Sequence, residues 1–458
     1  MRRLKALESF DKSLPESRWK GFLTSCAPFC KSVEEPGFSL YNEVINPSEG
    51  GIFMNRLASA VRSLAQAGGS FYLYDESSIF RHIDLLKETF PQAQFLYSIK
   101  CNPNPHVIQS VCSRGLGADT ASFGEVLAAE KAGLSPDQIY YSAPGKTSED
   151  IRRAMSRSTL IADSTGELLR IQAAAGESGQ ILHAGVRINP DFSFGGGPGS
   201  SSKFGIDESQ LYEFLAETPL KNVVIGGIHV HLKSQELRSE VLAEYYRNMF
   251  HLAETFEEKT GFPLKFLNLG SGMGIPYSPD DRPLDLEALK ETTAELFAGF
   301  HASHPDTAIL IETGRFAVGK SGYYVTRVLD RKISRGKTYL ILENTLNGFL
   351  RPVLARLICR YSPDPSPEGC EPLFTCRDEC GIMTFKEEPP SEQVTLAGNL
   401  CPAADVIAED ILLPHLEPGD IVAVTNAGSY AAALTPFQFS SQEKPAEFFL
   451  TEEGKILS

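Results

Sequence analysis

Lys100 is the first residue whose type and position could do chemistry. Residues 95–99 are apolar or β-prone and lead directly to this lysine, and Asn102 and Pro103 then break the strand. In barrels of parallel strands the carboxyl ends of the strands carry the chemistry, and a lysine held there can act as an amine nucleophile. A solvated surface lysine is the alternative, because most lysines are exposed charges.

A glycine cluster and a charged pair follow two other strand-like runs. Residues 270–274 alternate glycine with Ser271 and Met273, and glycines at a strand end let backbone N–H groups approach an anion such as phosphate. Glu312 and Arg315 end another run, where an ordinary ion pair is the alternative. These two runs therefore offer an anion-binding loop, a carboxylate and a guanidinium.

Two histidines at alternate positions end a further run. A period of two places His229 and His231 on one face of a strand, where each is either a packed core imidazole or a zinc ligand. No third ligand lies near them, so we predict no metal site. Cys370, Cys376 and Cys380 also lie close together, but their spacing matches no zinc pattern, and we expect ordinary loop cysteines.

These groups meet one requirement when they occur together. A lysine amine, a phosphate-binding loop with an arginine, a carboxylate and an imidazole are the parts that hold pyridoxal 5′-phosphate, with the lysine as its covalent anchor. The combination is much more specific than any single member. The sequence therefore predicts this cofactor.

Short apolar runs alternate with helical segments over the middle of the chain. About eight such runs lie within about 240 residues, which is the number and length typical of an α/β fold of the (β/α)₈ barrel class. The expected strands are residues 71–74, 95–99, 116–119, 139–142, 160–163, 182–189, 223–232, 266–270 and 308–313.

After Arg315 the pattern changes to strands without long helices between them. These runs predict a separate β-domain, and they are residues 323–329, 338–343, 393–397 and 420–425. We expect three parts: an N-terminal segment of residues 1–70 that partly packs with the β-domain, a barrel of residues 71–315, and a C-terminal β-domain of residues 316–458.

The whole chain has the composition of a globular protein. It has 458 residues, is 42% hydrophobic, and is long enough for two cores. Its net charge of −15 without a long basic cluster argues against nucleic acid or an anionic membrane as a partner. Nine scattered cysteines, no signal peptide and no run of transmembrane length lead us to expect a cytoplasmic location.

The order of the motifs resembles that of the fold-type III pyridoxal-phosphate decarboxylases. This group contains the diaminopimelate, ornithine and arginine decarboxylases, and the chain resembles the diaminopimelate branch most. The motifs are residues 97–102, 117–122, 229–235, 270–274, 312–315, Cys401 with Asp405, and 427–430. The resemblance implies a TIM-type barrel that binds the cofactor and a β-sandwich or barrel-like C-terminal domain, as in alanine racemase.

The resemblance also implies roles for single residues. Lys100 would bind the cofactor covalently, His231 would stack on its ring, and Glu312 would face the pyridine nitrogen. Further cofactor-binding residues would be Asp119, Ser234, Gly272, Gly274, Arg315 and Tyr430. Cys401 would donate a proton from the β-domain of a second subunit, which implies a homodimer with shared active sites.

Glu312 bears on the type of reaction. A carboxylate against the ring nitrogen keeps that nitrogen protonated, so the ring accepts the electron pair released when carbon dioxide leaves. An arginine there would weaken this effect, as a racemase prefers. Glu312 therefore favours decarboxylation over racemisation, and the Cys401 thiol can serve as a general acid.

The departures from the family pattern concern the substrate. An acidic residue follows the cysteine in diaminopimelate and ornithine decarboxylases, whereas Pro402 stands here and offers no charge. Ala355 replaces the closing tyrosine of the diaminopimelate enzymes, while Arg351 remains and could receive a carboxylate or amide together with Arg315. The expected substrate-binding residues are Arg315, Arg351, Ala355, Pro402 and Asp405.

We therefore predict decarboxylation of an α-amino acid with an acylated or acidic distal end. A citryl-diaminopropionate-like or carrier-bound glutamyl substrate has this character, which suggests siderophore or antibiotic biosynthesis and a carrier protein as a partner. Three alternatives stay open: a meso-diaminopimelate decarboxylase of lysine biosynthesis, a racemase, and a non-catalytic regulator of the antizyme-inhibitor kind.

Overall fold

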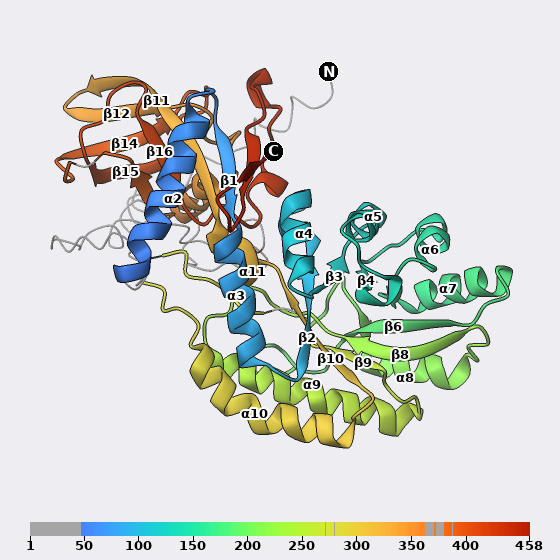
Figure 1. Cartoon of the computed structure of the whole chain (residues 1–458). Coiled ribbons are helices and arrows are strands. Elements are labelled where there is room, and N and C mark those ends of the chain that lie inside the picture. The colour runs from blue at the N-terminus through green and yellow to red at the C-terminus, as the bar shows by residue number, and fades with distance from the viewer. Residues whose placement is uncertain (1–46, 271, 279, 362–370, 372–379, 387) are drawn as a thin grey trace, which may run out of the picture. The chain divides into compact units, whose positions relative to one another are not determined.

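The computed structural model describes residues 47–270, 272–278, 280–361, 371, 380–386 and 388–458 (Figure 1). All of these belong to the compact unit Val44–Ser458. No helix within these residues is long and apolar enough to cross a membrane.

Eight parallel strands close into a barrel. They run in the order β2, β3, β4, β5, β6, β8, β9 and β10, and β10 pairs with β2 again. Their bounds are β2 (Ala93–Ser98), β3 (Gly117–Thr120), β4 (Ile139–Ser142), β5 (Thr159–Ala162), β6 (Leu182–Asn189), β8 (Val223–His229), β9 (Phe266–Asn268) and β10 (Ala308–Thr313). The short β7 (Ile206–Asp207) pairs with β6. This arrangement confirms the predicted barrel.

Helices alternate with the barrel strands along the chain and cover them (Figure 1). They are α3 (Glu76–Thr89), α4 (Pro105–Ser113), α5 (Phe123–Lys131), α6 (Ser148–Ala154), α7 (Thr165–Glu177), α8 (Glu208–Glu217), α9 (Ser239–Thr260) and α10 (Leu286–Ser303). Ser122 and Ser164 lie two residues after β3 and β5, and their side chains accept N–H groups of α5 and α7. These caps make each helix begin directly after its strand.

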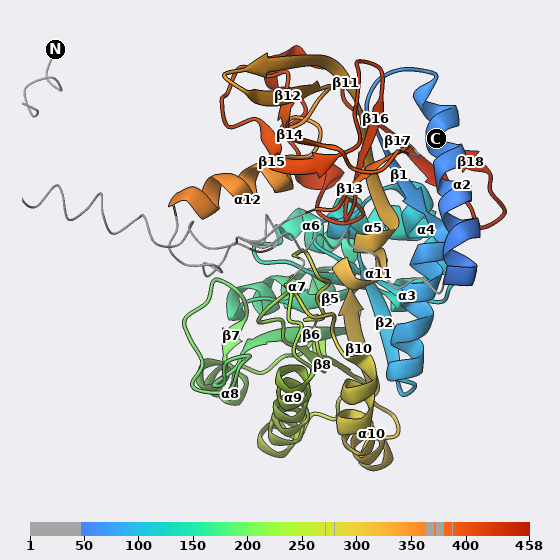
Figure 2. The same cartoon turned by 90° about the vertical axis from the view of Figure 1, so that its left-hand side faces the viewer.

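A nine-stranded sheet forms the second part of the fold, as predicted. It contains β1 (Phe71–Asp75), β11 (Gly322–Ser334), β12 (Lys337–Leu342), β13 (Ile382–Thr384), β14 (Glu392–Gly398), β15 (Val406–Leu413), β16 (Ile421–Val424), β17 (Ala446–Leu450) and β18 (Ile456–Leu457). Figure 2 shows α12 (Leu350–Tyr361) beside β15. The four strands expected from the sequence overlap with β11, β12, β14 and β16.

The first expected barrel strand belongs to this second sheet instead. β1 pairs antiparallel with β11 and parallel with β17, so the prediction that residues 71–74 begin the barrel was wrong. Phe71 packs in a cluster with Leu57 and Val61 of α2 (Pro47–Ala65), and Tyr72 contacts the ring of Tyr324. Both faces of β1 are therefore buried. A strand buried on both faces is apolar along its whole length, as a barrel strand is, and this similarity explains the wrong prediction.

Candidate active site

Lys100 lies in the turn that ends β2. After Ser98 the chain forms a short 3₁₀ turn, and the Lys100 Nζ atom lies 2.5 Å from Asp119 Oδ2 at the end of the neighbouring β3. The lysine side chain is 40% exposed, whereas that of Asp119 is buried. Partial loss of solvation lowers the pKa of Lys100, but Asp119 and Glu312 raise it above its ordinary value overall. The amine is therefore held by the Asp119 carboxylate, while part of the lysine side chain stays exposed.

Two buried carboxylates lie on the strands that flank β2. Asp119 belongs to β3 and Glu312 to β10, and each of these strands pairs with β2. Burial, and then repulsion from Glu312, raises the pKa of Asp119. Burial would also raise the pKa of Glu312, but His229 and Lys100 lower it well below its usual range. Glu312 is therefore the carboxylate that stays ionised.

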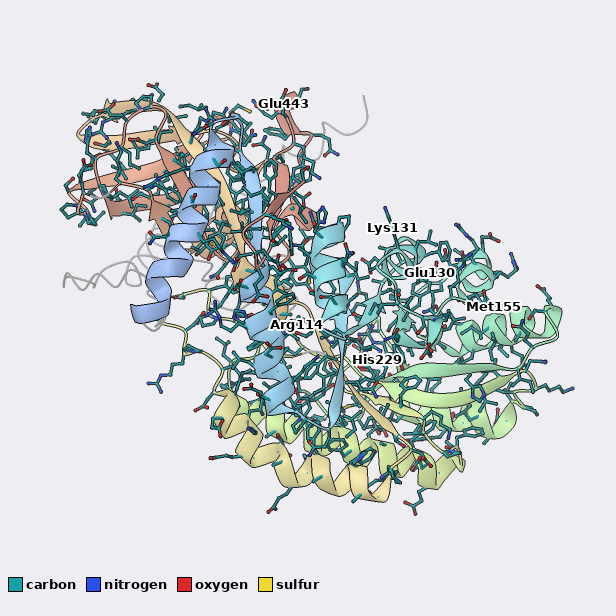
Figure 3. All side chains as sticks on the ribbon, in the orientation of Figure 1. Arg114, Glu130, Lys131, Met155, His229 and Glu443 are labelled. Carbon is teal, nitrogen blue, oxygen red and sulfur yellow. The ribbon has the colours of Figure 1, made fainter. Side chains whose placement is uncertain are left out.

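His229 fixes Glu312 in place. Its Nε2 atom lies 3.1 Å from Glu312 Oε1, and its Nδ1 atom lies 3.1 Å from Ser142 Oγ. The Asn268 side-chain amide donates a hydrogen bond to the same Glu312 oxygen, at 3.0 Å. Figure 3 labels His229, which lies among the barrel strands. The sequence pattern suggested a core histidine or a zinc ligand at this position, and it did not identify this partner.

His231 lies just beyond the end of β8. Its Nε2 atom is 3.4 Å from Ser234 Oγ, and Arg187 donates to its backbone carbonyl at 3.1 Å. Burial lowers the pKa of His231 to about 3, so the imidazole is neutral at ordinary pH. A neutral imidazole can lie flat against an aromatic ring without bringing a charge to it.

The glycine loop after β9 leaves no room for side chains. A Cβ atom on Gly270 would lie 2.2 Å from the Val230 carbonyl oxygen, and one on Gly274 would lie 2.9 Å from Gln235 Cα. Gly270 also has a φ of +66°. The glycines therefore let this loop pack tightly against the residues that follow β8. That Gly272 and Gly274 bind an anion stays a prediction. Ser271 lies outside the described residues.

Two buried arginines share one tyrosine ring. The Arg315 guanidinium lies 5.3 Å from the centroid of the Tyr277 ring and donates to its hydroxyl at 2.8 Å. Arg351 lies 4.8 Å from the same centroid, and Arg315 also forms an ion pair with Glu371. The Arg315 Nε atom is buried and has no hydrogen-bond partner among the described residues. This cluster can receive an anionic group such as a phosphate or a carboxylate.

Tyr430 connects the second sheet domain to the turn of Lys100. Its backbone N–H donates to the Cys101 carbonyl at 2.7 Å, and the Asn102 side chain donates to the Gly428 carbonyl at 2.9 Å. The Tyr430 ring centroid lies 5.0 Å from the Arg315 guanidinium. Tyr430 thus joins the lysine turn to the arginine cluster.

The other expected site residues lie in different surroundings. Cys401 is exposed and Pro402 half-buried. Asp405 is buried, where its carboxylate accepts the Leu346 and Leu400 N–H groups at 2.9 and 3.1 Å. Ala355 packs in a small apolar cluster of α12. The contacts around Lys100 described above do not include these four residues.

The sequence did not predict the contacts that Ser142, Asn268, Tyr277 and Glu371 make in the site. Tyr277 follows the glycine loop by three residues, but its sequence context did not show that it would meet two arginines. The described residues contain no group of three or more His, Cys, Asp or Glu side chains that could hold a metal ion. Cys370 and Cys376 lie outside the described residues.

The chain matches known decarboxylases in sequence and structure. Residues 76–319 match the family described as "Pyridoxal-dependent decarboxylase, pyridoxal binding domain". An L-glutamyl-[BtrI acyl-carrier protein] decarboxylase from Niallia circulans is 32% identical over 386 residues, which cover 82% of this chain and 87% of the relative. A 2-[(L-alanin-3-ylcarbamoyl)methyl]-2-hydroxybutanedioate decarboxylase from Staphylococcus aureus is 28% identical and covers 83% and 94% of the two chains.

A solved structure has the same fold. The diaminopimelate decarboxylase from Helicobacter pylori complexed with L-lysine superposes with a TM-score of 0.71 at 27% identity, over 86% of this chain and 95% of that chain.

Proposed function

The chain belongs to the family of pyridoxal-dependent decarboxylases, and we propose that it acts on an α-amino acid whose distal end is acylated or acidic. The observation that carries this proposal is the cluster of Arg315 and Arg351 around the Tyr277 ring. The two guanidiniums bring two positive charges together, and the Glu371 carboxylate that pairs with Arg315 balances only one of them. An anionic or carbonyl-rich distal group would therefore be stabilised between them, whereas a free ammonium group would not.

The residues around Lys100 fit pyridoxal 5′-phosphate. When bound, this cofactor supplies the electron sink that accepts the pair released as carbon dioxide leaves. Lys100 would hold it covalently, and His231 would pack against its ring. The phosphate would be held by the tight glycine loop and the unsatisfied Arg315 Nε atom. The residues that we propose for the phosphate are Ser234, Gly272, Gly274, Arg315 and Tyr430.

Glu312 would hold a proton on the ring nitrogen. Its pKa lies well below the usual range, although it is buried, because His229 and Lys100 stabilise the ionised form. His229 and Asn268 fix its orientation. An ionised carboxylate at this place favours decarboxylation over racemisation, because it strengthens the electron withdrawal by the ring. Asp119 would hold the Lys100 amine in position.

Cys401 would complete the site from a second subunit. The thiol is exposed in this chain, so it can reach into a partner's site. We propose a homodimer with shared active sites, in which Cys401 protonates the reacting carbon as a general acid. Pro402 beside it offers no charge to a distal ammonium group.

The names of two relatives support this substrate class. The Niallia circulans protein acts on an L-glutamyl group on an acyl-carrier protein, and the Staphylococcus aureus protein acts on an alanine unit joined through a carbamoyl group to a hydroxybutanedioate. In both names the amino acid is joined to a larger carrier or acyl group. Substrates of this kind would place the protein in siderophore or antibiotic biosynthesis, with a carrier protein as a possible partner.

Replacement of Arg351 tests the proposal. Arg351→Met should lower kcat/KM for citryl-diaminopropionate or carrier-bound glutamate by roughly 10- to 100-fold, because a charged hydrogen bond is lost. The absorbance of the bound cofactor should stay unchanged. Meso-diaminopimelate decarboxylation is the second candidate, favoured by the likeness to the Helicobacter pylori enzyme. Rapid release of carbon dioxide from meso-diaminopimelate, with none from the acylated substrates, would support that candidate instead.

A further inference from the structure

The loop after β8 is tied to the glycine loop after β9 by four hydrogen bonds. The Glu236 N–H donates to the Gly272 carbonyl at 2.8 Å, and the Gly274 N–H donates to the Glu236 carbonyl at 3.0 Å. The Gln235 side chain adds the other two: its Oε1 accepts the Ile275 N–H at 3.2 Å, and its Nε2 donates to the Ile275 carbonyl. A single side chain thus satisfies both backbone groups of one residue.

Gln235 occupies a position where glycine would be expected. Its φ of +62° lies in the left-handed region, which non-glycine residues adopt rarely and at some cost. The Gln235 backbone also lies so close to Gly274 that residue 274 has no room for a Cβ atom. Glycine would adopt this backbone conformation without strain, but it could not form the two side-chain hydrogen bonds to Ile275. These two bonds explain why a glutamine stands at this position.

Ion pairs also hold the loop after β8 on the side away from the glycine loop. The buried Glu236 carboxylate lies 3.0 Å from Lys233 Nζ and 2.7 Å from Arg238 Nε. Burial would raise the pKa of Glu236, but hydrogen bonds from Arg238 and Lys233 lower it to about 2. Residues 235 and 236 are therefore held between a charged cluster on one side and the glycine loop on the other.

We propose that Gln235 is a positioning residue for the phosphate-binding loop. Its amide holds Ile275, and through it Gly272 and Gly274, in register with the loop that carries His231 and Ser234. The two loops then form one unit, so the groups at the cofactor ring and those at its phosphate keep a fixed spacing. The proposal rests on the cofactor that the family uses, and it is independent of the substrate proposed above.

Cofactor affinity tests this role without any substrate. Apoenzyme would be titrated with pyridoxal 5′-phosphate and, separately, with pyridoxal, which lacks the phosphate. Gln235→Ala should weaken the affinity for pyridoxal 5′-phosphate about tenfold, as expected for the loss of two side-chain hydrogen bonds. Its affinity for pyridoxal should change less than about twofold. An equal loss for both ligands would overturn the proposal, since it would indicate a general disturbance of the site.

Two further variants separate the amide from other effects. Gln172→Ala is the control. Gln172 lies on α7, and its side-chain Oε1 also accepts a backbone N–H, that of Lys221, at 2.7 Å. This variant should leave the affinities for both ligands unchanged. Gln235→Gly relieves the left-handed backbone and remains able to fold, but it also deletes the amide. It should lose the same affinity as Gln235→Ala, whereas wild-type affinity in Gln235→Gly would contradict a role for the side chain.

Discussion

Two carboxylates near one lysine differ in their protonation behaviour. Burial raises the pKa of Asp119, whereas His229 and Lys100 lower that of Glu312 below its usual range. The barrel therefore shifts the pKa values of two neighbouring carboxyl groups in opposite directions. Asp119 is in contact with the Lys100 amine, and we propose the ionised Glu312 as the partner of the ring nitrogen.

Glu312→Gln tests the role of the ionised carboxylate. The amide keeps the size and can still contact His229 and Asn268, but it cannot stabilise a proton on the ring. We expect carbon dioxide release to fall roughly 100-fold at saturating substrate, because a preorganised charge in a buried site is lost. Cofactor content, read from its absorbance, should remain close to that of the wild type. Unchanged turnover would remove Glu312 from the proposed mechanism.

His231 should make the apoenzyme less stable in mild acid. Its pKa of about 3 lies below the value of about 6.5 in an unfolded chain, so between these values the unfolded state binds more protons. The free energy of unfolding is therefore unaffected by the titration of His231 above about pH 6.5, and it decreases as the pH falls from about 6.5 towards 3. His231→Phe should therefore show a smaller fall in Tm than the wild type between about pH 7.5 and 5.5. An identical fall in both proteins would contradict the neutral state of His231.

At the scale of elements, strand order brings the site together. β3 and β10 flank β2, so residues far apart in sequence reach Lys100 from both sides. The turn after β2 is tied to the second sheet domain by Asn102, which is buried and donates to the Gly428 carbonyl. This connection sets where the Tyr430 ring meets Arg315.

Asn102→Ala should loosen that connection. It leaves a buried carbonyl without its donor, which costs about 1–3 kcal/mol in the free energy of unfolding. Urea denaturation of the apoenzyme measures this change. Asn222→Ala is the control, because its amide donates to an exposed carbonyl at 3.3 Å, and it should cost less than about 0.5 kcal/mol. An equal decrease in the free energy of unfolding in the two variants would contradict a stabilising role for the hydrogen bond from Asn102.

Sequence patterns predicted these elements unevenly. The strand that leads to Lys100 and the runs that end at Asp119 and Glu312 were predicted, because apolar runs broken by glycine or proline are local features. The prediction for β1 was wrong because a strand that is buried on both faces has the same apolar sequence pattern in the barrel and in the second sheet. The contact of His229 with Glu312 depends on the closure of the barrel, which no local pattern records.

At the scale of the molecule, we propose that two subunits contribute to each site. The proposed proton donor, Cys401, is exposed and lies outside the contacts around Lys100 in its own chain. Apart from residues 71–74, which belong to the second sheet, the predicted limits of the three parts of the chain stay predictions. Substrate selection would then depend on residues from two chains, Arg351 from one and Pro402 from the other.

Mixing of two inactive variants tests the shared site. Lys100→Ala and Cys401→Ala should each lose most activity, the latter by about 100-fold or more as a lost general acid. In a heterodimer of the two, one site carries both changes and the other carries neither. Random exchange should therefore restore about a quarter of wild-type activity. Failure to recover activity, with heterodimers demonstrated by mass spectrometry, would place both residues in the same chain's site.

One competition experiment tests most directly whether the enzyme prefers a substrate with an acylated or acidic distal end. The wild-type holoenzyme would be incubated with equimolar meso-diaminopimelate and citryl-diaminopropionate, and both amine products would be quantified by mass spectrometry. The product ratio equals the ratio of kcat/KM. We predict that the decarboxylated acyl product exceeds lysine by at least about tenfold, because Arg315 and Arg351 favour an acidic distal group and Pro402 offers nothing to an ammonium. Lysine as the main product would contradict the account.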